Sequence, residues 1–254
     1  MSHHHRGVGR LMVLTHLSPS RIETFEQCQL KYHAIYEEKL PEAPPHPLTV
    51  MGKAVHKAAE LGMKMLMSGQ PVQWDGLVRK TCASMGVSKP NMELARELMR
   101  NAVKWGYLRN FEKCRDTEIE FFLEMPDGTK VKGIIDRLDL DVPWWADIID
   151  IKTQQRQMDD AGLADRWQSL TYNWAVRRLY PELTGDVRVS YWVLRHRVQR
   201  CWMTKEDARR AEAMLMQKAL EIRSCADPKP SPSALCQWCP KRATCPAASE
   251  GVKA

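Results

Sequence analysis

The spacing of apolar residues changes near the middle of the chain, and this change restricts the fold more than any other feature. From about Met51, and again from Asn91 to Lys113, apolar residues recur every three or four positions, which predicts amphipathic helices. The following segments predict strands over 118–125, 129–141 and 144–153, a helix over 159–180, strands over 187–194 and 198–203, and a helix to about Ser224. The first three strands are joined by short turns, which favours an antiparallel meander. The whole order indicates a mixed α/β domain.

Capping and breaking residues predict where several of these elements begin. Ser20 and Glu23 have the spacing of a capping box for an N-terminal helix. The segment Pro41–Pro47 holds four prolines and is expected to be a loop. Thr204 and Asp207 are expected to cap the last helix.

Composition narrows the environment and the partner. The 254 residues carry a formal charge of +7, with a sequence pI of about 9.0, which favours a polyanionic partner such as nucleic acid. No apolar run approaches the roughly 20 residues of a membrane helix, and no secretory signal precedes the first helix. We therefore expect no membrane partner and a cytoplasmic location in a bacterial, archaeal or phage-infected cell. Residues 1–17, which include three consecutive histidines, and 247–254 are expected to be a flexible N-terminus and a tail.

Two acidic residues lie within apolar strands in the middle of the chain. Residues two apart on a strand point to the same face, so Asp150 and Lys152 project together while Ile149 and Ile151 face the core. Asp136 lies in the apolar run of the preceding strand. Two neighbouring carboxylates repel unless a cation lies between them, and hard oxygen ligands favour Mg²⁺ or Mn²⁺. The alternative is a pair of surface acids on adjacent strands.

Three of the eight cysteines follow the pattern Cys-x2-Cys-x5-Cys near the C-terminus, at Cys236, Cys239 and Cys245. Three thiolates leave one position open on a four-coordinate centre, and Cys28, about 210 residues upstream, is the best candidate to fill it. Without an export signal a disulfide framework is improbable. Spacing alone does not separate zinc from iron. The remaining cysteines match no motif and are interpreted as structural: Cys82, Cys114, Cys201 and Cys225.

Together these motifs resemble the PD-(D/E)XK nuclease superfamily, in its RecB-type iron–sulfur branch, which includes AddB and the CRISPR-associated exonucleases. The resemblance rests on five elements in family order: the segment 18–28, Gly52-Lys53-Ala54-Val55-His56, Asp136, Asp150-Ile151-Lys152, and Gln168-Ser169-Leu170-Thr171-Tyr172. It implies a restriction-endonuclease-like core in a single nuclease domain over 18–246. Within this domain we expect a helical part over about 51–115, a catalytic core over about 118–203 and a cluster segment over about 225–246. Ile135 replaces the proline of the family name, and Gln29 stands where a proline often follows the first cysteine.

The resemblance also implies roles for single residues. Asp136, Asp150, the backbone carbonyl of Ile151 and the imidazole of His56 would hold Mg²⁺ or Mn²⁺, and Lys152 would orient the attacking water. Gln168 and Tyr172 would position the substrate or the lysine. Cys28, Cys236, Cys239 and Cys245 would hold a [4Fe–4S] cluster, with zinc as the less favoured occupant.

Several residues near these motifs carry weaker expectations. Glu60 and Glu120 could each touch the metal through water, although neither belongs to a motif. Trp144, Trp145 and Trp167 could stack on single-stranded bases, but packing is the favoured interpretation for each.

The activity implied is a metal-dependent DNA exonuclease that acts on DNA ends and prefers single strands. A helicase, a recombinase or a CRISPR adaptation complex could be its partner. Three alternatives stay open: a DNA-end-binding module that does not cut, an iron–sulfur redox regulator, and an enzyme acting on RNA.

Overall fold

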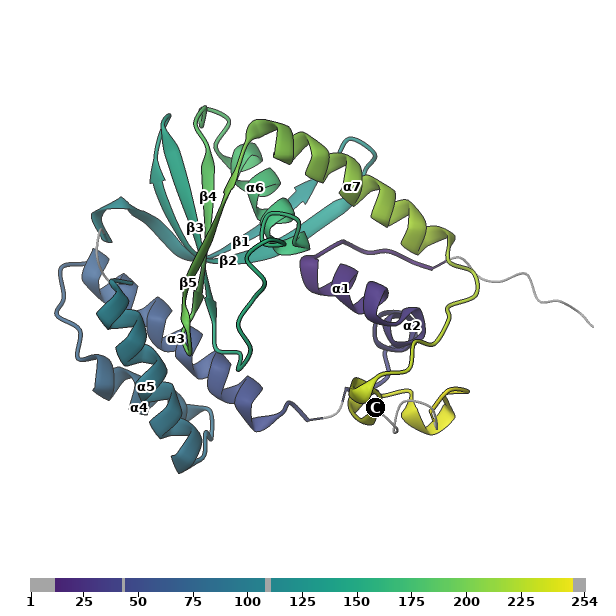
Figure 1. Ribbon diagram of the computed structural model, residues 1–254, viewed down its shortest axis with the longest axis horizontal. Coiled ribbons are helices and arrows are strands. Elements are labelled where there is room, and N and C mark those ends of the chain that lie inside the picture. Colours follow the sequence, from purple (N-terminus) through teal and green to yellow (C-terminus); the bar gives the residue numbers. More distant parts are fainter. Residues whose placement is uncertain (1–11, 43, 108–110, 249–254) are drawn as a thin grey trace, which may run out of the picture. The chain divides into compact units, whose positions relative to one another are not determined.

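The protein is described by a computed structural model that covers residues 12–42, 44–107 and 111–248 (Figure 1). The three histidines near the start of the chain, and residues 249–254 of the expected tail, lie outside the described residues. The chain divides into two compact units. One unit comprises Met1–Pro44, Leu123–Lys132 and Ala213–Ala254, and the other comprises Pro45–Phe122 and Gly133–Glu212.

The elements follow the mixed order that the sequence predicts. Helices are α1 (Pro19–Gln27), α2 (Gln29–Tyr36), α3 (Pro47–Met67), α4 (Trp74–Ser84), α5 (Lys89–Trp105), α6 (Trp167–Leu179) and α7 (Lys205–Ser224). Strands are β1 (Cys114–Glu124), β2 (Lys130–Asp141), β3 (Trp145–Lys152), β4 (Val187–Val193) and β5 (Arg197–Met203). Short 3₁₀ helices are η1 (Phe111–Lys113), η2 (Ala234–Trp238) and η3 (Arg242–Thr244). None of the described helices is long and apolar enough to cross a membrane.

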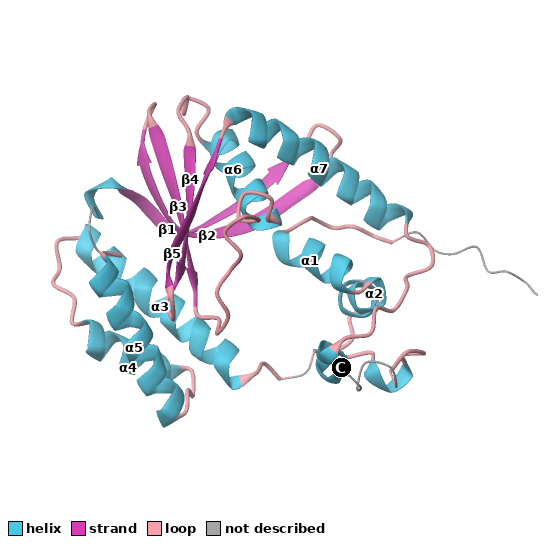
Figure 2. Ribbon diagram, in the orientation of Figure 1, coloured by secondary structure: helices cyan, strands magenta, loops and turns pink. Residues whose placement is uncertain are grey.

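The five strands form one mixed sheet in the order β1-β2-β3-β4-β5 (Figure 2). β2 pairs with β3 and β4 pairs with β5 in antiparallel fashion, whereas β3 and β4 are parallel. The parallel pair needs a crossover connection, which contains α6. The predicted mixed α/β class is therefore confirmed, as is the antiparallel pairing of the second and third strands.

The two faces of β3 are covered by different helices of the larger unit. Ile149 and Ile151 belong to a buried cluster with apolar residues of α3, α4 and α5. The opposite face carries Asp150, and its parallel partner Tyr191 bonds Ser169 of α6 at 2.6 Å. Six of the eight residues of β3 are buried, which explains why this strand is a nearly continuous apolar run.

The smaller unit joins segments that are distant in sequence. Leu17 is fully buried and pairs with Val131, through backbone hydrogen bonds of 2.7 and 2.8 Å to Lys130 and Lys132. Lys218 of α7 forms an ion pair of 3.0 Å with Glu26 of α1. These contacts attach the N-terminal segment to the start of β2 and to the C-terminal half of α7.

Two helix starts differ from the prediction. α1 begins two residues earlier than the Ser20–Glu23 box implies, because Ser18 caps it and Pro19 occupies its first turn. Pro47 likewise begins α3 instead of ending a loop, since proline is favoured in the first turn of a helix. The predicted cap of α7 is confirmed: the Thr204 hydroxyl accepts from the Asp207 amide at 3.1 Å.

The extents of two other helices were wrong in the prediction. α5 ends at Trp105 and not near Lys113, because Gly106 adopts φ 92° and closes the helix in the left-handed region. α6 begins at Trp167, and the residues from Asp159 onward form turns, in which the Asp159 carboxylate accepts from the Ala161 amide at 3.2 Å. α4 was not predicted.

Candidate active site

The two acidic strand residues lie next to one another at the end of the β2–β3 ladder. The last pair of this ladder is Arg137 with Ile149, so one further step places Asp136 opposite Asp150. At that step the strands no longer bond through their backbones alone. The amide of Ile151 donates instead to the Asp136 carboxylate at 2.7 Å. A side chain thus replaces a backbone acceptor where the site opens.

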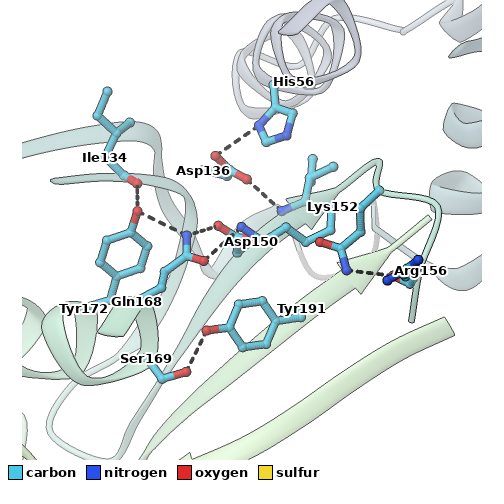
Figure 3. A network of polar contacts seen from close by, with 12 residues as sticks. His56, Ile134, Asp136, Asp150, Lys152, Arg156, Gln168, Ser169, Tyr172 and Tyr191 are labelled. Carbon is cyan, nitrogen blue, oxygen red and sulfur yellow. Dashed lines mark hydrogen bonds and ion pairs between the residues drawn. The ribbon is translucent and has the colours of Figure 1, made fainter. Parts of the chain in front are cut away.

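Asp136 also meets a histidine from α3 (Figure 3). Nδ1 of His56 lies 3.2 Å from the second carboxylate oxygen of Asp136. α3 can bring His56 this close because Gly52 faces β3 without a side chain: a Cβ there would lie 2.8 Å from Oγ1 of Thr153. The Gly-x-x-x-His spacing therefore has a packing reason. Burial lowers the pKa of His56, but Asp136 and neighbouring carboxylates outweigh it and raise that pKa to about 9.

Gln168 of α6 connects Asp150 and Lys152. Its carbonyl oxygen accepts from Nζ of Lys152 at 2.9 Å, and its amide donates to Asp150 at 2.5 Å. Lys152 Nζ lies 2.8 Å from the other oxygen of Asp150. The Gln168 amide also lies 3.3 Å from the hydroxyl of Tyr172, which donates to the Ile134 carbonyl at 2.5 Å. Figure 3 shows these contacts as one continuous network.

Asp150 is a buried carboxylate beside the ammonium of Lys152. Its Oδ2 atom is inaccessible to solvent, and it accepts no hydrogen bond of good geometry from the described residues, although the charge of Lys152 is close. Burial raises the pKa of Asp150, the ammonium of Lys152 lowers it, and the carboxylate of Asp136 raises it. A cation beside Asp150 would offset both the cost of burying its charge and its repulsion by Asp136.

A third carboxylate, which the sequence analysis missed, completes the group. Possible ligand atoms of His56, Glu118 and Asp136 all lie within 4.8 Å of one another, and these three form the single compact set of this kind among the described residues. Asp150 lies outside this set. Glu118 has φ 51°, which interrupts the alternation of β1 and explains why counting by two along the strand does not find it. Burial and the nearby Asp136 raise the pKa of Glu118.

The two weaker acidic candidates and the three tryptophans do not join the set of possible metal ligands. Glu60 borders the same cavity but is held by Lys57 and Lys64, at 2.7 and 2.8 Å. Glu120 is exposed and does not line the cavity. Neither Trp145 nor Trp167 lines the cavity. Trp144 is 70% exposed and precedes β3, whereas Asp150 lies near the other end of that strand.

The site opens into a cavity of about 810 Å³ within the larger unit. Its lining includes His56, Glu118, Ile151 and Lys152, together with polar residues that follow β3. A cavity of this size, open to solvent, can admit a nucleotide-sized ligand next to the acidic group.

The four cysteines of the predicted cluster lie together in the smaller unit. Cys28, Cys236, Cys239 and Cys245 all line one small cavity, and each is a free thiol. Sγ of Cys28 accepts from the amides of Lys31 and Ser231, both at 3.4 Å, and Sγ of Cys236 accepts from the Ser233 amide at 3.3 Å. The other four cysteines do not line this cavity.

Comparisons with known proteins identify the family and the fold. Residues 16–246 match the PD-(D/E)XK nuclease superfamily. A crystal structure of a candidate exonuclease from Eubacterium rectale superposes with a TM-score of 0.56 at 12% identity, covering 92% of this chain and 87% of that one. The protein SSO0001 gives a TM-score of 0.39 at 16% identity, covering 84% and 92%, which is too low to support an argument. No curated protein matches.

Proposed function

The chain belongs to the PD-(D/E)XK nuclease superfamily, and from that premise we propose a Mg²⁺- or Mn²⁺-dependent exonuclease that degrades DNA from its ends and prefers single strands. The observation that carries the proposal is the convergence of His56, Glu118 and Asp136 beside the Asp150–Lys152 pair, at the mouth of one cavity. The likeness to a candidate exonuclease supports the same mode of attack.

The residues present suit a hard divalent cation. His56, Asp136 and Glu118 offer one nitrogen and carboxylate oxygens within a short span, and Asp150 adds a buried carboxylate beside them. We propose these four as ligands, together with the carbonyl of Ile151 that the resemblance implies. When bound, the ion would polarise the phosphoryl oxygen and acidify a water molecule.

The protein side chains would orient the reacting groups. Nζ of Lys152 is held by Asp150 and Gln168. Its third N–H donor therefore points in a fixed direction. An ammonium fixed in this way can orient the attacking water and stabilise charge on the phosphate as the bond breaks. Gln168 acts through Lys152 and Asp150, and Tyr172 acts through Gln168, so we assign both as positioning residues.

We further propose that the four clustered cysteines hold a [4Fe–4S] cluster. A tetrahedral zinc ion with Zn–S bonds of about 2.3 Å would place its sulfurs about 3.8 Å apart. Among the described residues, no three cysteine sulfurs lie within 4.8 Å of one another, although all four border the same cavity. Four thiolates around one cavity suit either group, and the resemblance to the iron–sulfur branch favours the cluster.

The nuclease proposal is tested with end-labelled single- and double-stranded DNA and Mg²⁺ or Mn²⁺. Asp136→Ala and Lys152→Ala should each abolish cleavage while circular dichroism stays unchanged, and full activity in either variant would remove the site assignment. Glu118→Gln should weaken Mn²⁺ binding measured by calorimetry, whereas Glu120→Gln, on the exposed side of the same strand, should not. Stepwise shortening of the labelled strand distinguishes an exonuclease from an endonuclease.

The same preparation tests the alternatives. An anaerobically purified protein should be brown and absorb broadly near 400 nm, and a colourless protein that contains zinc would overturn the cluster. Binding to labelled ends without cleavage would favour the end-binding module. Equal cleavage of labelled RNA would extend the substrate beyond DNA.

A further inference from the structure

Two basic side chains in the active-site cavity have no acidic partner among the described residues. Four lysine and arginine side chains line the cavity: Lys53, Lys57, Lys152 and Arg195. Lys57 pairs with Glu60 at 2.7 Å, and Lys152 pairs with Asp150 at 2.8 Å. Lys53 makes no hydrogen bond or ion pair to the described residues, and Arg195 uses only its Nε, which donates to the Thr153 carbonyl at 3.1 Å. The four N–H donors on the two Nη atoms of Arg195 are therefore available to a ligand.

Both cations lie near the segment that directly follows β3: Arg195 bonds it, and Lys53 follows Gly52, which packs against it. Gly52, which precedes Lys53, packs against Thr153 so closely that an added Cβ would lie 2.8 Å from its Oγ1. The carbonyl of the same Thr153 holds Arg195. Arg195 from the β4–β5 turn thus bonds the chain one residue beyond Lys152, and Lys53 is the next residue of α3 after the glycine that packs there.

The turn that carries Arg195 is fixed by its neighbours. The Leu194 amide donates to the Lys152 carbonyl at 2.9 Å, and the Leu194 carbonyl accepts from Asn101 of α5 at 2.9 Å. On the other side, Nε2 of His196 lies 2.6 Å from the Gln155 carbonyl. A guanidinium held in place loses little conformational entropy when it binds an anion.

We propose that Lys53 and Arg195 form a phosphate subsite, which binds the backbone of the nucleic-acid strand one or a few nucleotides from the phosphate being cut. The proposal rests on the nuclease function above and deepens it by assigning two residues that position the strand. A guanidinium binds two phosphate oxygens at once, and a lysine adds a point charge. The acidic group repels a polyanion, so cations without acidic partners beside it are needed to hold the strand.

The test measures binding separately from cleavage. A fluorescein-labelled single-stranded oligonucleotide is titrated with the full-length protein in EDTA at several salt concentrations, by anisotropy. Lys53→Gln and Arg195→Gln should each lower the slope of the logarithm of the binding constant against the logarithm of salt concentration by about 0.7, the value for one lost phosphate contact on a single strand. The matched controls Lys80→Gln and Arg200→Gln remove exposed cations that do not line the cavity, and should leave the slope unchanged.

Cleavage under Mn²⁺ supplies the second readout. Because the two residues position the strand and do not touch the reacting atoms, each variant should raise KM while kcat at saturation stays within about twofold of the wild type. If the wild type binds and cuts, but the cavity variants match the controls in slope and KM, the subsite is refuted and the nuclease stands. If the variants lower the slope while the wild type never cuts, the subsite stands and the nuclease falls. A wild type that neither binds nor cuts overturns both.

Discussion

Replacing Gln168 with leucine should slow cleavage while the other contacts of the site persist. Leucine fills a similar volume but removes the acceptor for Lys152 and the donor for Asp150. The ion pair between Lys152 and Asp150, at 2.8 Å, does not depend on Gln168 and should persist. The variant therefore tests whether the direction of the ammonium matters, apart from its presence.

The expected size follows from the number of bonds lost. A hydrogen bond to a charged group contributes about 1.5–3 kcal/mol, and the retained ion pair means that one such bond defines the orientation of Lys152. At 1.36 kcal/mol per tenfold, the single-turnover rate should fall about 10- to 150-fold. Tyr172→Phe removes a weaker, indirect contact worth about 0.5–1.5 kcal/mol, or about 2- to 13-fold.

The assay is single-turnover cleavage of an end-labelled single strand with saturating Mn²⁺, which isolates the chemical step from product release. Gln154→Leu is the matched control, because Gln154 also lines the cavity but bonds only the Arg156 carbonyl among the described residues. If Gln168→Leu cuts as fast as Gln154→Leu, then Gln168 does not orient the lysine, and the positioning role assigned to it is wrong.

Two further predictions concern stability. Asp139→Ala leaves Arg137, which is 1% exposed, without its paired carboxylate and should cost about 3–5 kcal/mol. At roughly 2–4 °C per kcal/mol for a chain of this size, its Tm should fall by about 6–20 °C. Asp141→Ala breaks an exposed pair on the same strand and should cost at most about 1 kcal/mol, so equal losses by calorimetry would contradict the burial argument. Cys28→Ala should lower both iron content and Tm, whereas Cys225→Ala, outside the cysteine cavity, should change neither. An unchanged iron content in Cys28→Ala would show that Cys28 is not the fourth ligand.

The site residues that lie two apart on a strand or four apart on a helix were predictable from the sequence. Asp150 and Lys152 share a strand face, and Gln168 and Tyr172 share a helix face, and the structure joins all four in one network. Their assigned roles stay predictions. Glu118 escaped because its positive φ breaks the strand period, and such a local backbone turn has no signature in the spacing of apolar residues.

The helix that was missed shows a different limit. Trp74, Leu77, Val78 and Cys82 do follow the spacing of an amphipathic helix, but the segment is only 11 residues long and contains a glycine, which weakens the indication. Its position depends on α3, where Gly62 leaves room for Trp74: an added Cβ would lie 2.1 Å from the indole ring. A helix that depends on a partner in this way is determined by tertiary packing, which a single sequence does not display.

The assembly of the smaller unit from the first, middle and last parts of the chain has a consequence for its synthesis. Cys28 leaves the ribosome 208 residues before Cys236, which at about 5–20 residues per second is a delay of about 10–40 s. The larger unit, complete at Glu212, can fold during that interval. The N-terminal helices cannot complete the smaller unit until residues from Ala213 onward have been synthesised. A nascent chain stalled before Cys236 would therefore contain Cys28 without the other three cysteines of the cavity, which can join it only after Cys245 has left the ribosome.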